Sequence, residues 1–284
     1  RSDMERTVLV TGSSSGIGRA TVERFLEEDW TVYATARDPD DLDEFRGRDG
    51  CRVDQLDVTV DEHVDRVVER MIDETERVDC LVNNAGYGQL GPVEDVPTDA
   101  VRDQYEVNVF GPHRLTRAVL PEMRRREDGT VIDVTSVAAR LPFPGGGVYS
   151  GTKAALSAQD QALRAEVSGY GIDVVEVEPG PVETNFTDRA EAEMDGVDRS
   201  DAYEGVYRLF EDYGAVGGDG PLSVPPTAVA DQIVAAASST DPAPRYPVGP
   251  VARLATVADL LPLWARARLW AAVARLAGLG GDDD

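Results

Sequence analysis

The sequence predicts an α/β fold, a doubly wound parallel β-sheet with helices on both faces. Two observations support this prediction. Short strand-like runs alternate with longer helix-like stretches over the first two-thirds of the chain. The chain also has 284 residues, of which 42% are hydrophobic, enough to bury one large core. No internal repeat or low-complexity linker divides it, so we expect one main domain over residues 4–250.

The strand-like runs are rich in β-branched and apolar residues. They are expected as strands at Thr7–Val10, Thr31–Thr35, Arg52–Leu56, Cys80–Val82, Thr130–Thr135 and Ile172–Val177. The stretches between them have helical spacing and are expected as helices at Ile17–Glu28, Glu62–Thr75, Thr98–Arg126 and Val148–Val167. Because parallel neighbours need a long, right-handed crossover, this alternation predicts a doubly wound sheet.

The character of the chain changes after Pro181. Residues Glu183–Pro226 are acidic, rich in glycine and interrupted by proline, which predicts a mobile helix-loop insertion. The insertion could close over an apolar ligand as a lid, or its aromatic residues could be ordinary packing residues. These residues are Phe186, Tyr203, Tyr207, Phe210 and Tyr213.

Residues 251–280 are expected to form an amphipathic helical extension. Four arginines and one aspartate give this segment a net charge of +3, against −28 for the rest of the chain. Such a helix can bind a membrane surface or a partner, or it can pack on the acidic body of its own chain. We favour the packing interpretation.

The charge of the whole chain is strongly negative. It has 53 Asp and Glu against 28 Lys and Arg, a net charge of −25, and Lys153 is its only lysine. This field repels phosphate backbones and argues against nucleic-acid binding. An acidic, lysine-poor composition resembles that of proteins from salt-loving cells, such as halophilic archaea. A GC-rich genome would explain the arginines but not the excess of aspartate.

Cysteine and histidine are scarce. Cys51 and Cys80 are too few for a disulfide framework, and His63 and His113 do not combine with them into metal-ligand spacing. We therefore expect no metal. The sequence shows no signal peptide and no apolar run long enough to span a bilayer, so a cytoplasmic protein is expected.

A glycine-rich segment, Thr11–Gly18, follows the first predicted strand and opens the first helix. Glycines in this context let the backbone approach a pyrophosphate, which then lies at the positive end of the helix. The segment predicts a Rossmann-type dinucleotide site. Its cofactor-binding residues are expected to be Gly12, Ser14, Ser15, Gly16, Ile17 and Gly18.

The end of the second strand indicates which dinucleotide binds. An acidic residue here would accept the ribose 2′-hydroxyl of NAD, whereas a cation suits the 2′-phosphate of NADP. The strand ends with Arg37, and a guanidinium pairs well with phosphate, so we expect NADP(H) to be preferred over NAD(H). Asp38 could instead neutralise Arg37 in a surface ion pair.

Tyr149 and Lys153 are four residues apart on a predicted helix, so their side chains lie on one face. A phenol has an ordinary pKa of about 10, and a nearby ammonium lowers it by stabilising the phenolate. The pair is therefore suited to proton transfer, and it contains the only lysine of the chain.

Together the motifs resemble the short-chain dehydrogenase/reductase family, over about residues 7–184. The motifs are the glycine-rich segment, Asn83-Asn84-Ala85-Gly86, Ser136, Tyr149 with Lys153, and Pro179–Thr184. Arg37 and the surroundings of Asn84 and Pro179 are similar to the branch of hydroxysteroid and retinol dehydrogenases. Asp133, where relatives often have Asn, and Gly151-Thr152, in place of Ala-Ser, depart from the pattern.

The resemblance implies four catalytic residues. Tyr149 would be the general acid/base, and Ser136 would hydrogen-bond the substrate oxygen. Lys153 would hold the nicotinamide ribose and lower the pKa of Tyr149, and Asn108 would anchor a water that links Lys153 to solvent. Ser136 could instead only end its strand, and Asn108 could brace the helix backbone.

The resemblance also implies further cofactor contacts. Asp57 and Val58 would lie at the adenine, and Asn83, Ala85 and Gly86 would lie on the cofactor side of the central strand. The nicotinamide face would be lined by Pro179, Gly180, Val182 and Thr184. Asn83 and Asn84 could instead cap a strand end.

These residues predict an NADP(H)-dependent oxidoreductase that interconverts a carbonyl group and an alcohol on a small substrate. The alternative is a protein that binds NADP without catalysis and senses redox state. The intact set of Ser136, Tyr149 and Lys153 argues against a sensor, because a sensor needs no proton donor. The resemblance further implies a homodimer or homotetramer, formed through the helices near 98–126 and 148–167.

Overall fold

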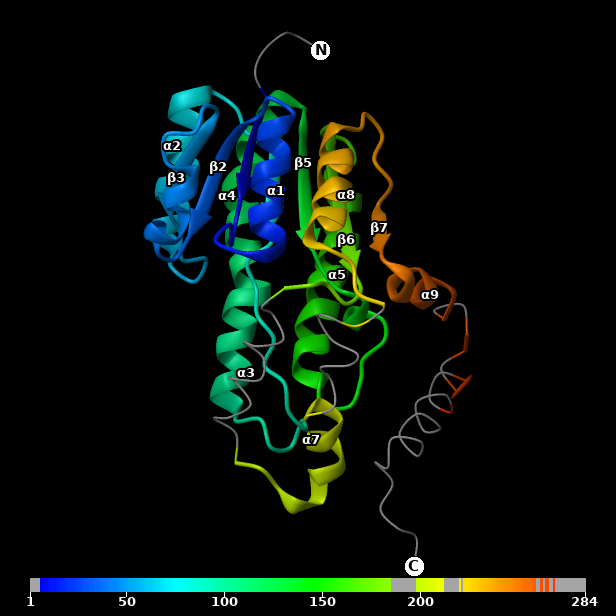
Figure 1. The fold of residues 1–284 in the computed structure, drawn as a ribbon. Coiled ribbons are helices and arrows are strands. Elements are labelled where there is room, and N and C mark those ends of the chain that lie inside the picture. The colour runs from blue at the N-terminus through cyan, green and yellow to red at the C-terminus, as the bar shows by residue number, and fades with distance from the viewer. Residues whose placement is uncertain are drawn as a thin grey trace, which may run out of the picture.

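The computed structural model contains one seven-stranded parallel sheet, which confirms the predicted fold class (Figure 1). It describes residues 6–184, 198–211, 220, 222–258, 261–262, 264–265 and 268. The strand order is β3-β2-β1-β4-β5-β6-β7, and every neighbouring pair is parallel. The strands are β1 (Thr7–Val10), β2 (Thr31–Ala36), β3 (Cys51–Gln55), β4 (Cys80–Asn83), β5 (Gly129–Val134), β6 (Ile172–Pro179) and β7 (Arg245–Val248).

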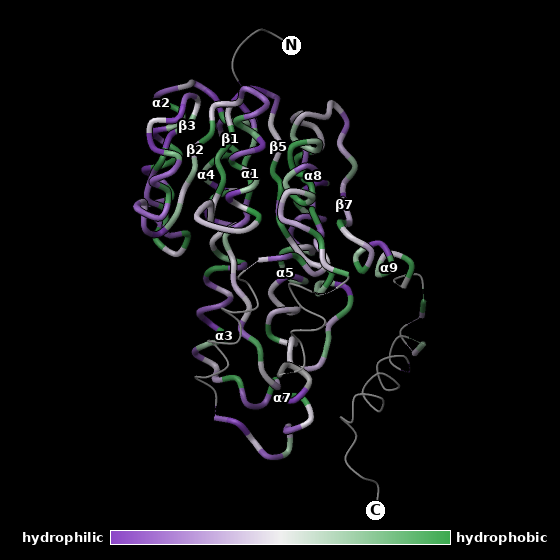
Figure 2. The backbone as a smooth tube through the Cα atoms, viewed as in Figure 1, coloured by the Kyte–Doolittle hydropathy of each residue, from purple (hydrophilic) through white to green (hydrophobic). Residues whose placement is uncertain are grey.

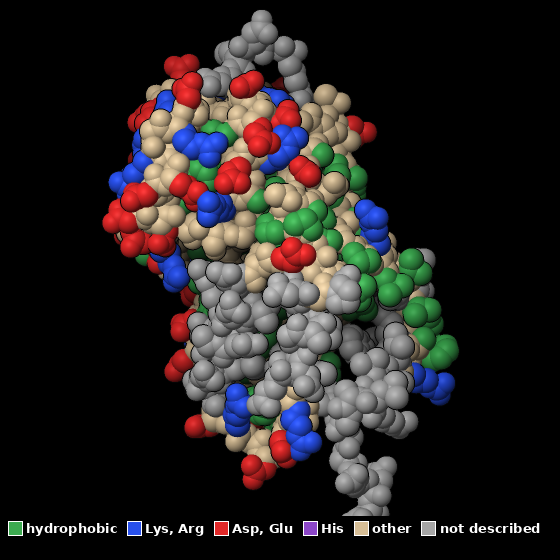
Figure 3. All heavy atoms as spheres, viewed as in Figure 1, with side chains coloured by type: hydrophobic (Ala, Val, Ile, Leu, Met, Phe, Trp, Pro, Cys, Tyr) green, Lys and Arg blue, Asp and Glu red, His purple; other side chains and the backbone are tan. Residues whose placement is uncertain are grey.

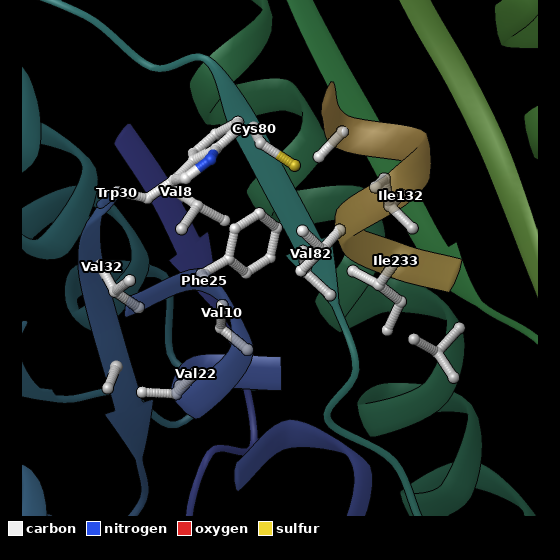
Figure 4. Packing of buried hydrophobic residues seen from close by; sticks show 14 of the residues in the cluster. Val8, Val10, Val22, Phe25, Trp30, Val32, Cys80, Val82, Ile132 and Ile233 are labelled. Atoms are coloured by element: carbon white, nitrogen blue, oxygen red, sulfur yellow. The ribbon is translucent and has the colours of Figure 1, made fainter. Parts of the chain in front are cut away.

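Two helical layers cover the sheet. On one face α1 (Gly16–Glu27) and α8 (Pro226–Ser238) pack side by side, and Phe25, Trp30 and Ile233 fill the core beneath them (Figure 4). On the other face lie α2 (Asp61–Thr75), α4 (Gly111–Arg126) and α5 (Gly147–Val167). Figure 2 shows hydrophobic residues along the strands and hydrophilic ones on the outer helices α2 and α3. The sheet is thus buried on both faces, as a parallel sheet requires.

The long helix expected over Thr98–Arg126 is present with an interruption. Its segments are α3 (Thr98–Tyr105), a π-helical turn η2 (Glu106–Phe110) and α4. A π turn inserts an extra residue and often lies at a functional site. Here it carries Asn108, which is buried.

The other predicted strands and helices agree with the structure within one or two residues at each end. Short 3₁₀ turns, η1 (Pro39–Phe45) and η3 (Val137–Ala139), follow β2 and β5. The sequence reasoning identified neither α8 nor β7. β7 is a four-residue edge strand that contains Pro247, which lacks an N–H donor, so its strand signal is weak.

The described part of residues 183–226 contains a 3₁₀ turn, η4 (Asp201–Tyr203), and α7 (Glu204–Glu211). Tyr207 is buried, and its hydroxyl donates to the Asp95 carboxylate at 2.7 Å. Tyr203 donates in the same way to Glu94. Of the other expected lid aromatics, Phe186, Tyr213 and the side chain of Phe210 lie outside the described residues.

The segment 251–280 begins as a helix, α9 (Pro250–Ala258). Beyond 258 only Leu261, Pro262, Trp264, Ala265 and Arg268 are described, and the Arg268 guanidinium lies 5.5 Å from the centre of the Trp264 ring. Figure 3 shows exposed hydrophobic side chains around α9, where Leu254 and Val257 face solvent. Among the described residues, every helix is too short or too polar to cross a membrane.

Candidate active site

The predicted site residues converge on the carboxyl edge of the sheet. In a parallel sheet the loops that follow all strands meet at this edge, where ligands of open α/β sheets bind. The glycine-rich loop follows β1, Asn83–Gly86 ends β4, Ser136 follows β5, and Pro179–Thr184 follows β6. Tyr149 and Lys153 come from the first turns of α5, at the same edge.

The glycine-rich loop is held closely between β1 and β4. Gly12 has a φ of +67°, and a Cβ added there would lie 2.9 Å from the Cα of Ala85. A Cβ on Gly18 would lie only 2.1 Å from the carbonyl oxygen of Gly12. Any side chain at either position would therefore displace the backbone of the loop.

Asn84 and Thr11 fix the loop, a role that the sequence reasoning did not assign. The Asn84 amide donates to the carbonyl oxygens of Thr11 at 2.9 Å and of Gly12 at 3.1 Å. The Thr11 hydroxyl accepts from the backbone N–H groups of Asn84 and Ala85, each at 3.0 Å. These contacts join residues more than 70 positions apart, which a single sequence does not reveal.

The amino end of α1 suits a diphosphate. Ser15 is the N-cap of the helix but makes no side-chain hydrogen bond to it, and the first turn has no acidic residue. The exposed N–H groups and the helix dipole are therefore available to an anion. Ser14, Ser15, Gly16 and Ile17 are partly exposed at this end, and a Cβ on Gly16 would lie 3.0 Å from Thr184 of the β6 loop. This cradle fits the pyrophosphate of a dinucleotide.

Arg37 lies at the end of β2 and is exposed. Asp38, its possible neutralising partner, accepts instead from the backbone N–H of Asp40 at 3.0 Å and so caps η1. The Arg37 carbonyl accepts from Gln55 of β3 at 3.0 Å, which fixes the backbone from which the guanidinium extends.

Asp57 and Val58 follow β3 near Arg37. Burial opposes ionisation of Asp57, but its hydrogen bonds from Thr59, at 2.9 and 2.7 Å, and the charge of Arg37 leave its pKa below the ordinary value. Val58 is buried against Gly111, the first residue of α4. Asp57 is therefore an ionised group at the end of β3.

Tyr149 lies on the first turn of α5 and is partly exposed. Like Phe143 and Val206, Tyr149 packs against the buried Leu90, in a small apolar cluster separate from the main cores. Ser136, at the end of β5, is also partly exposed, and its hydroxyl accepts from the backbone N–H of Ala138 at 3.1 Å. The Ser136 hydroxyl proton is not used in that bond.

Lys153 is buried one turn after Tyr149. Its Nζ donates to the carbonyl oxygen of Val134 in β5 at 2.8 Å. Burial lowers the pKa of Lys153 to about 8, while the charges of Asp133 and Asp160 raise it. An ammonium with this pKa is poised near neutral pH.

Asn108 joins the π turn to both β4 and α5. Its amide donates to the Tyr87 carbonyl oxygen at 2.9 Å and to the Thr152 hydroxyl at 3.1 Å, and it accepts from the Tyr87 N–H at 3.1 Å. A Cβ on Gly86 would lie 3.0 Å from the Asn108 side-chain oxygen and 3.6 Å from Lys153 Nζ. Gly86 thus allows these two side chains to approach the end of β4.

A row of polar side chains lies behind Lys153, on the face of the sheet that α5 covers. Asn83, Asp133, Glu176 and Arg245 are paired in register across β4, β5, β6 and β7, and we call them the polar row. Asn83, Asp133 and Glu176 are almost completely buried. The sequence predicted Asn83 as a site residue and indicated Asp133 as a departure from the family pattern. It gave no role to Glu176 or Arg245.

The loop after β6 closes the edge. Gly180 donates to the Val248 carbonyl oxygen at 3.0 Å, and Val182 forms a parallel bridge with Val224. These bonds hold Pro179, Gly180 and Val182 in place, and Thr184 then contacts Gly16 as described above. The loops after β1 and β6 therefore meet over the carboxyl edge.

Comparison with known proteins matches this architecture. Residues 6–195 match the model of the short chain dehydrogenase family. An NADPH-dependent 3-dehydrocapnine reductase from Ornithobacterium rhinotracheale is 34% identical over 253 residues, which cover 86% of this chain and 88% of the relative.

Two solved structures are similar over most of their length. A short-chain dehydrogenase from Streptomyces avermitilis has a TM-score of 0.81 and 34% identity, and the match covers 97% of this chain and 99% of that one. A serine dehydrogenase in complex with NADP⁺ has a TM-score of 0.75 and 27% identity, with 86% and 95% covered.

Proposed function

The chain belongs to the short-chain dehydrogenase/reductase family, and on this premise we propose that it uses NADP(H) to interconvert a carbonyl group and an alcohol, with Tyr149 as general acid/base. Members of this kind are NAD(P)-dependent oxidoreductases that act on CH–OH groups, and this chain is one of them. The residue roles, the NADP(H) preference and the substrate are the proposed part.

The position of Lys153 carries the proposal. The only lysine of the chain is buried, points from α5 to the end of β5, and lies close to Gly86 at the end of β4. An ammonium held one turn after Tyr149 stabilises the phenolate form of that residue. This placement supports a phenol that exchanges protons near neutral pH.

The other side chains support the same reaction. When bound, the nicotinamide ring supplies or accepts the hydride. Tyr149 would give its proton to the carbonyl oxygen in reduction and take the alcohol proton in oxidation. The Ser136 hydroxyl would donate to the same oxygen as negative charge develops there. Asn108 is bonded to Thr152, the neighbour of Lys153. It would anchor the water that links Lys153 to solvent for proton transfer.

The dinucleotide would lie along the carboxyl edge. The glycine-rich loop and the open amino end of α1 would bind the diphosphate, and the exposed Arg37 would bind the 2′-phosphate. Asp57 would lie at the adenine and Asn83, Ala85 and Gly86 beneath the ribose of the nicotinamide. The similarity to a reductase named NADPH-dependent and to a dehydrogenase in complex with NADP⁺ supports the choice of NADP(H).

The surroundings of Tyr149 favour an apolar substrate. Tyr149, Phe143 and Val206 all pack against Leu90, and Val206 comes from α7 in the inserted segment. A helix that contributes to the wall of the site can select the substrate. An apolar wall would suit the hydroxysteroid and retinol branch that the sequence suggested. Homo-oligomer formation and dependence on high salt stay predictions.

Replacing Tyr149 with Phe tests the proposed reaction. Loss of the proton donor should lower kcat by about 10²- to 10⁴-fold in NADPH-dependent carbonyl reduction, with cofactor affinity retained. A panel of ketones and alcohols, followed by NADPH absorbance in high salt, supplies the substrate. Tyr170→Phe, in the exposed turn that follows α5, is the matched control and should keep its activity. Retained activity in Tyr149→Phe would refute Tyr149 as the proton donor.

Replacing Arg37 with Ala tests the cofactor preference. The loss of hydrogen bonds to a charged phosphate should raise KM for NADPH by about tenfold or more and leave KM for NADH almost unchanged. Arg46→Ala removes another exposed guanidinium of the same region, paired with Asp40 and Asp43, and should change neither value. Equal effects of Arg37→Ala on the two cofactors would contradict the assignment.

A further inference from the structure

Asp133 and Asp160 form a buried carboxyl pair directly behind Lys153. Each side chain is 2% exposed, and the two carboxyl groups lie within hydrogen-bonding distance of each other. Asp133 belongs to β5, next to Val134, whose carbonyl oxygen accepts from Lys153. Asp160 lies two turns after Lys153 on the same face of α5.

The guanidinium groups near this pair are bound to other carboxylates. Arg164 and Arg245, the guanidinium groups closest along the polar row, are bound to Glu176 at 3.5 and 3.3 Å. Ser157 also donates to Glu176, at 2.6 Å. Glu178 pairs with Arg140 and Arg245, each at 3.0 Å. The charge of Arg164 still lowers the pKa of Asp160, whereas Lys153 is the cation whose own pKa is raised by both aspartates.

Two ionised aspartates would fit this site poorly. Oδ1 of Asp133 and Oδ2 of Asp160 are buried and have no hydrogen-bond donor among the described residues. Asn83, paired in register with Asp133, favours the ionised form of that carboxyl but cannot serve both carboxylates. Two like charges in contact would also repel strongly in a buried site, so one proton is expected on the pair.

We propose that Asp133 and Asp160 share one proton and together hold a single negative charge behind Lys153, which keeps its ammonium protonated where Tyr149 works. Both aspartates are thus positioning residues, since they act through Lys153. The inference rests on the proposed function for its catalytic meaning. The charge of the pair can be tested without cofactor or substrate.

The single lysine of the chain makes the test direct. Labelling with ¹³C-lysine gives one side-chain signal, from Lys153, whose chemical shift follows its protonation. In the wild type we expect a titration midpoint near pH 8. The variants are Asp133→Asn, Asp160→Asn and the double variant, with Asp79→Asn as the control, since Asp79 is a buried carboxylate at the opposite edge of the sheet.

A shared proton predicts a distinctive pattern. In each single variant the remaining aspartate is ionised, so the charge behind Lys153 is unchanged and the midpoint stays in place. The double variant removes the charge, and the midpoint should fall by about one pH unit or more. Asp79→Asn should leave the midpoint unchanged. A fall in both single variants would show two negative charges, and no fall in the double variant would show none. Either result overturns the proposal.

A second measurement covers failure of the double variant to fold. Labelling with ¹³C-aspartate reports the carboxyl carbons of the folded wild type. The signals of Asp133 and Asp160 are assigned as those that disappear in the corresponding single variants. At neutral pH the pair should hold one proton in total, and two fully ionised carboxyl carbons would overturn the proposal.

The catalytic consequence is read separately. The pH profile of kcat in the double variant should move in the same direction as the Lys153 midpoint. If the midpoint moves and the profile does not, the pair does not act on catalysis. If the wild type lacks NADP(H)-dependent activity altogether, the proposed function fails, but the titration result stands.

Discussion

Buried carboxylates lie at both the amino and the carboxyl ends of the parallel strands, and the charged groups around them differ. At the amino edge Asp79 accepts from the backbone and hydroxyl of Thr7, at 2.7 and 3.1 Å, and from two nitrogens of Arg77. At the carboxyl edge Asp133 faces Asp160, and the nearby guanidinium groups bind Glu176. A buried charge that only supports the fold is paired with its own cation. The pair behind Lys153 instead faces an ammonium for which we propose a catalytic role.

The largest effect is expected at the amino edge. Arg77→Met leaves the buried Asp79 with the Thr7 hydrogen bonds and the more distant Arg126 guanidinium, at 4.0 Å, which should lower the free energy of unfolding by about 3 kcal/mol. Denaturant titration measures this loss. Arg102→Met removes an exposed arginine paired with Asp99 and should have little effect. Equal losses in the two variants would mean that Asp79 does not depend on Arg77.

The next effect concerns pH at the carboxyl edge. Burial, and for Asp160 also the charge of Asp133, raises the pKa of both aspartates above that of the unfolded chain. The folded protein therefore binds a proton that the unfolded chain releases above about pH 4, and stability falls as pH rises from there. In the Asp160→Asn variant the folded protein does not bind this extra proton.

The variant should accordingly show a weaker pH dependence of stability. Between about pH 5 and pH 8 the slopes of wild type and Asp160→Asn should differ by about 1.4 kcal/mol per pH unit. Unfolding at several pH values, in one buffer series of constant salt, measures the difference. Parallel curves would contradict an extra proton in the folded state.

The smallest effect is expected at a carboxylate on the surface. Tyr207→Phe removes the hydroxyl that donates to Asp95 and should cost about 1 kcal/mol. Because this bond ties residues 198–211 to the loop before α3, hydrogen exchange in α7 should also speed up. Tyr246→Phe, whose hydroxyl accepts from an exposed backbone N–H, is the control. Unchanged exchange in Tyr207→Phe would show that other contacts anchor α7.

Much of the fold could be predicted from the sequence because the strands are continuous apolar runs. Thr7–Val10 is buried at every residue, and its predicted limits agree with those of β1. β7 could not be recognised in this way, since its proline and its edge position reduce the strand signal. The carboxyl-edge position of Ser136, Tyr149 and Lys153 also followed from the predicted strand and helix ends.

Contacts that depend on strand register could not be predicted. The seven-residue spacing of Lys153 and Asp160 places them on one helix face, but Asp133 reaches that face only through the pairing of β4, β5 and β6. The bonds from Asn84 to the glycine-rich loop likewise depend on the β1–β4 contact. A single amino-acid sequence contains no signal for these long-range contacts.

The π turn at Glu106–Phe110 has a consequence for insertions and deletions. One residue added to a regular α-helix rotates everything after it by about 100°, whereas a π turn takes up the extra residue in one wider turn. In this chain α3 contacts α5, whereas α4 directs Leu115, Val119 and Met123 into the core beneath the sheet. Deleting a single residue from the turn would restore a regular helix with both faces still aligned, but it would move Asn108 from the place where it bonds Tyr87 and Thr152. The length of this segment is therefore constrained together with the position of Asn108.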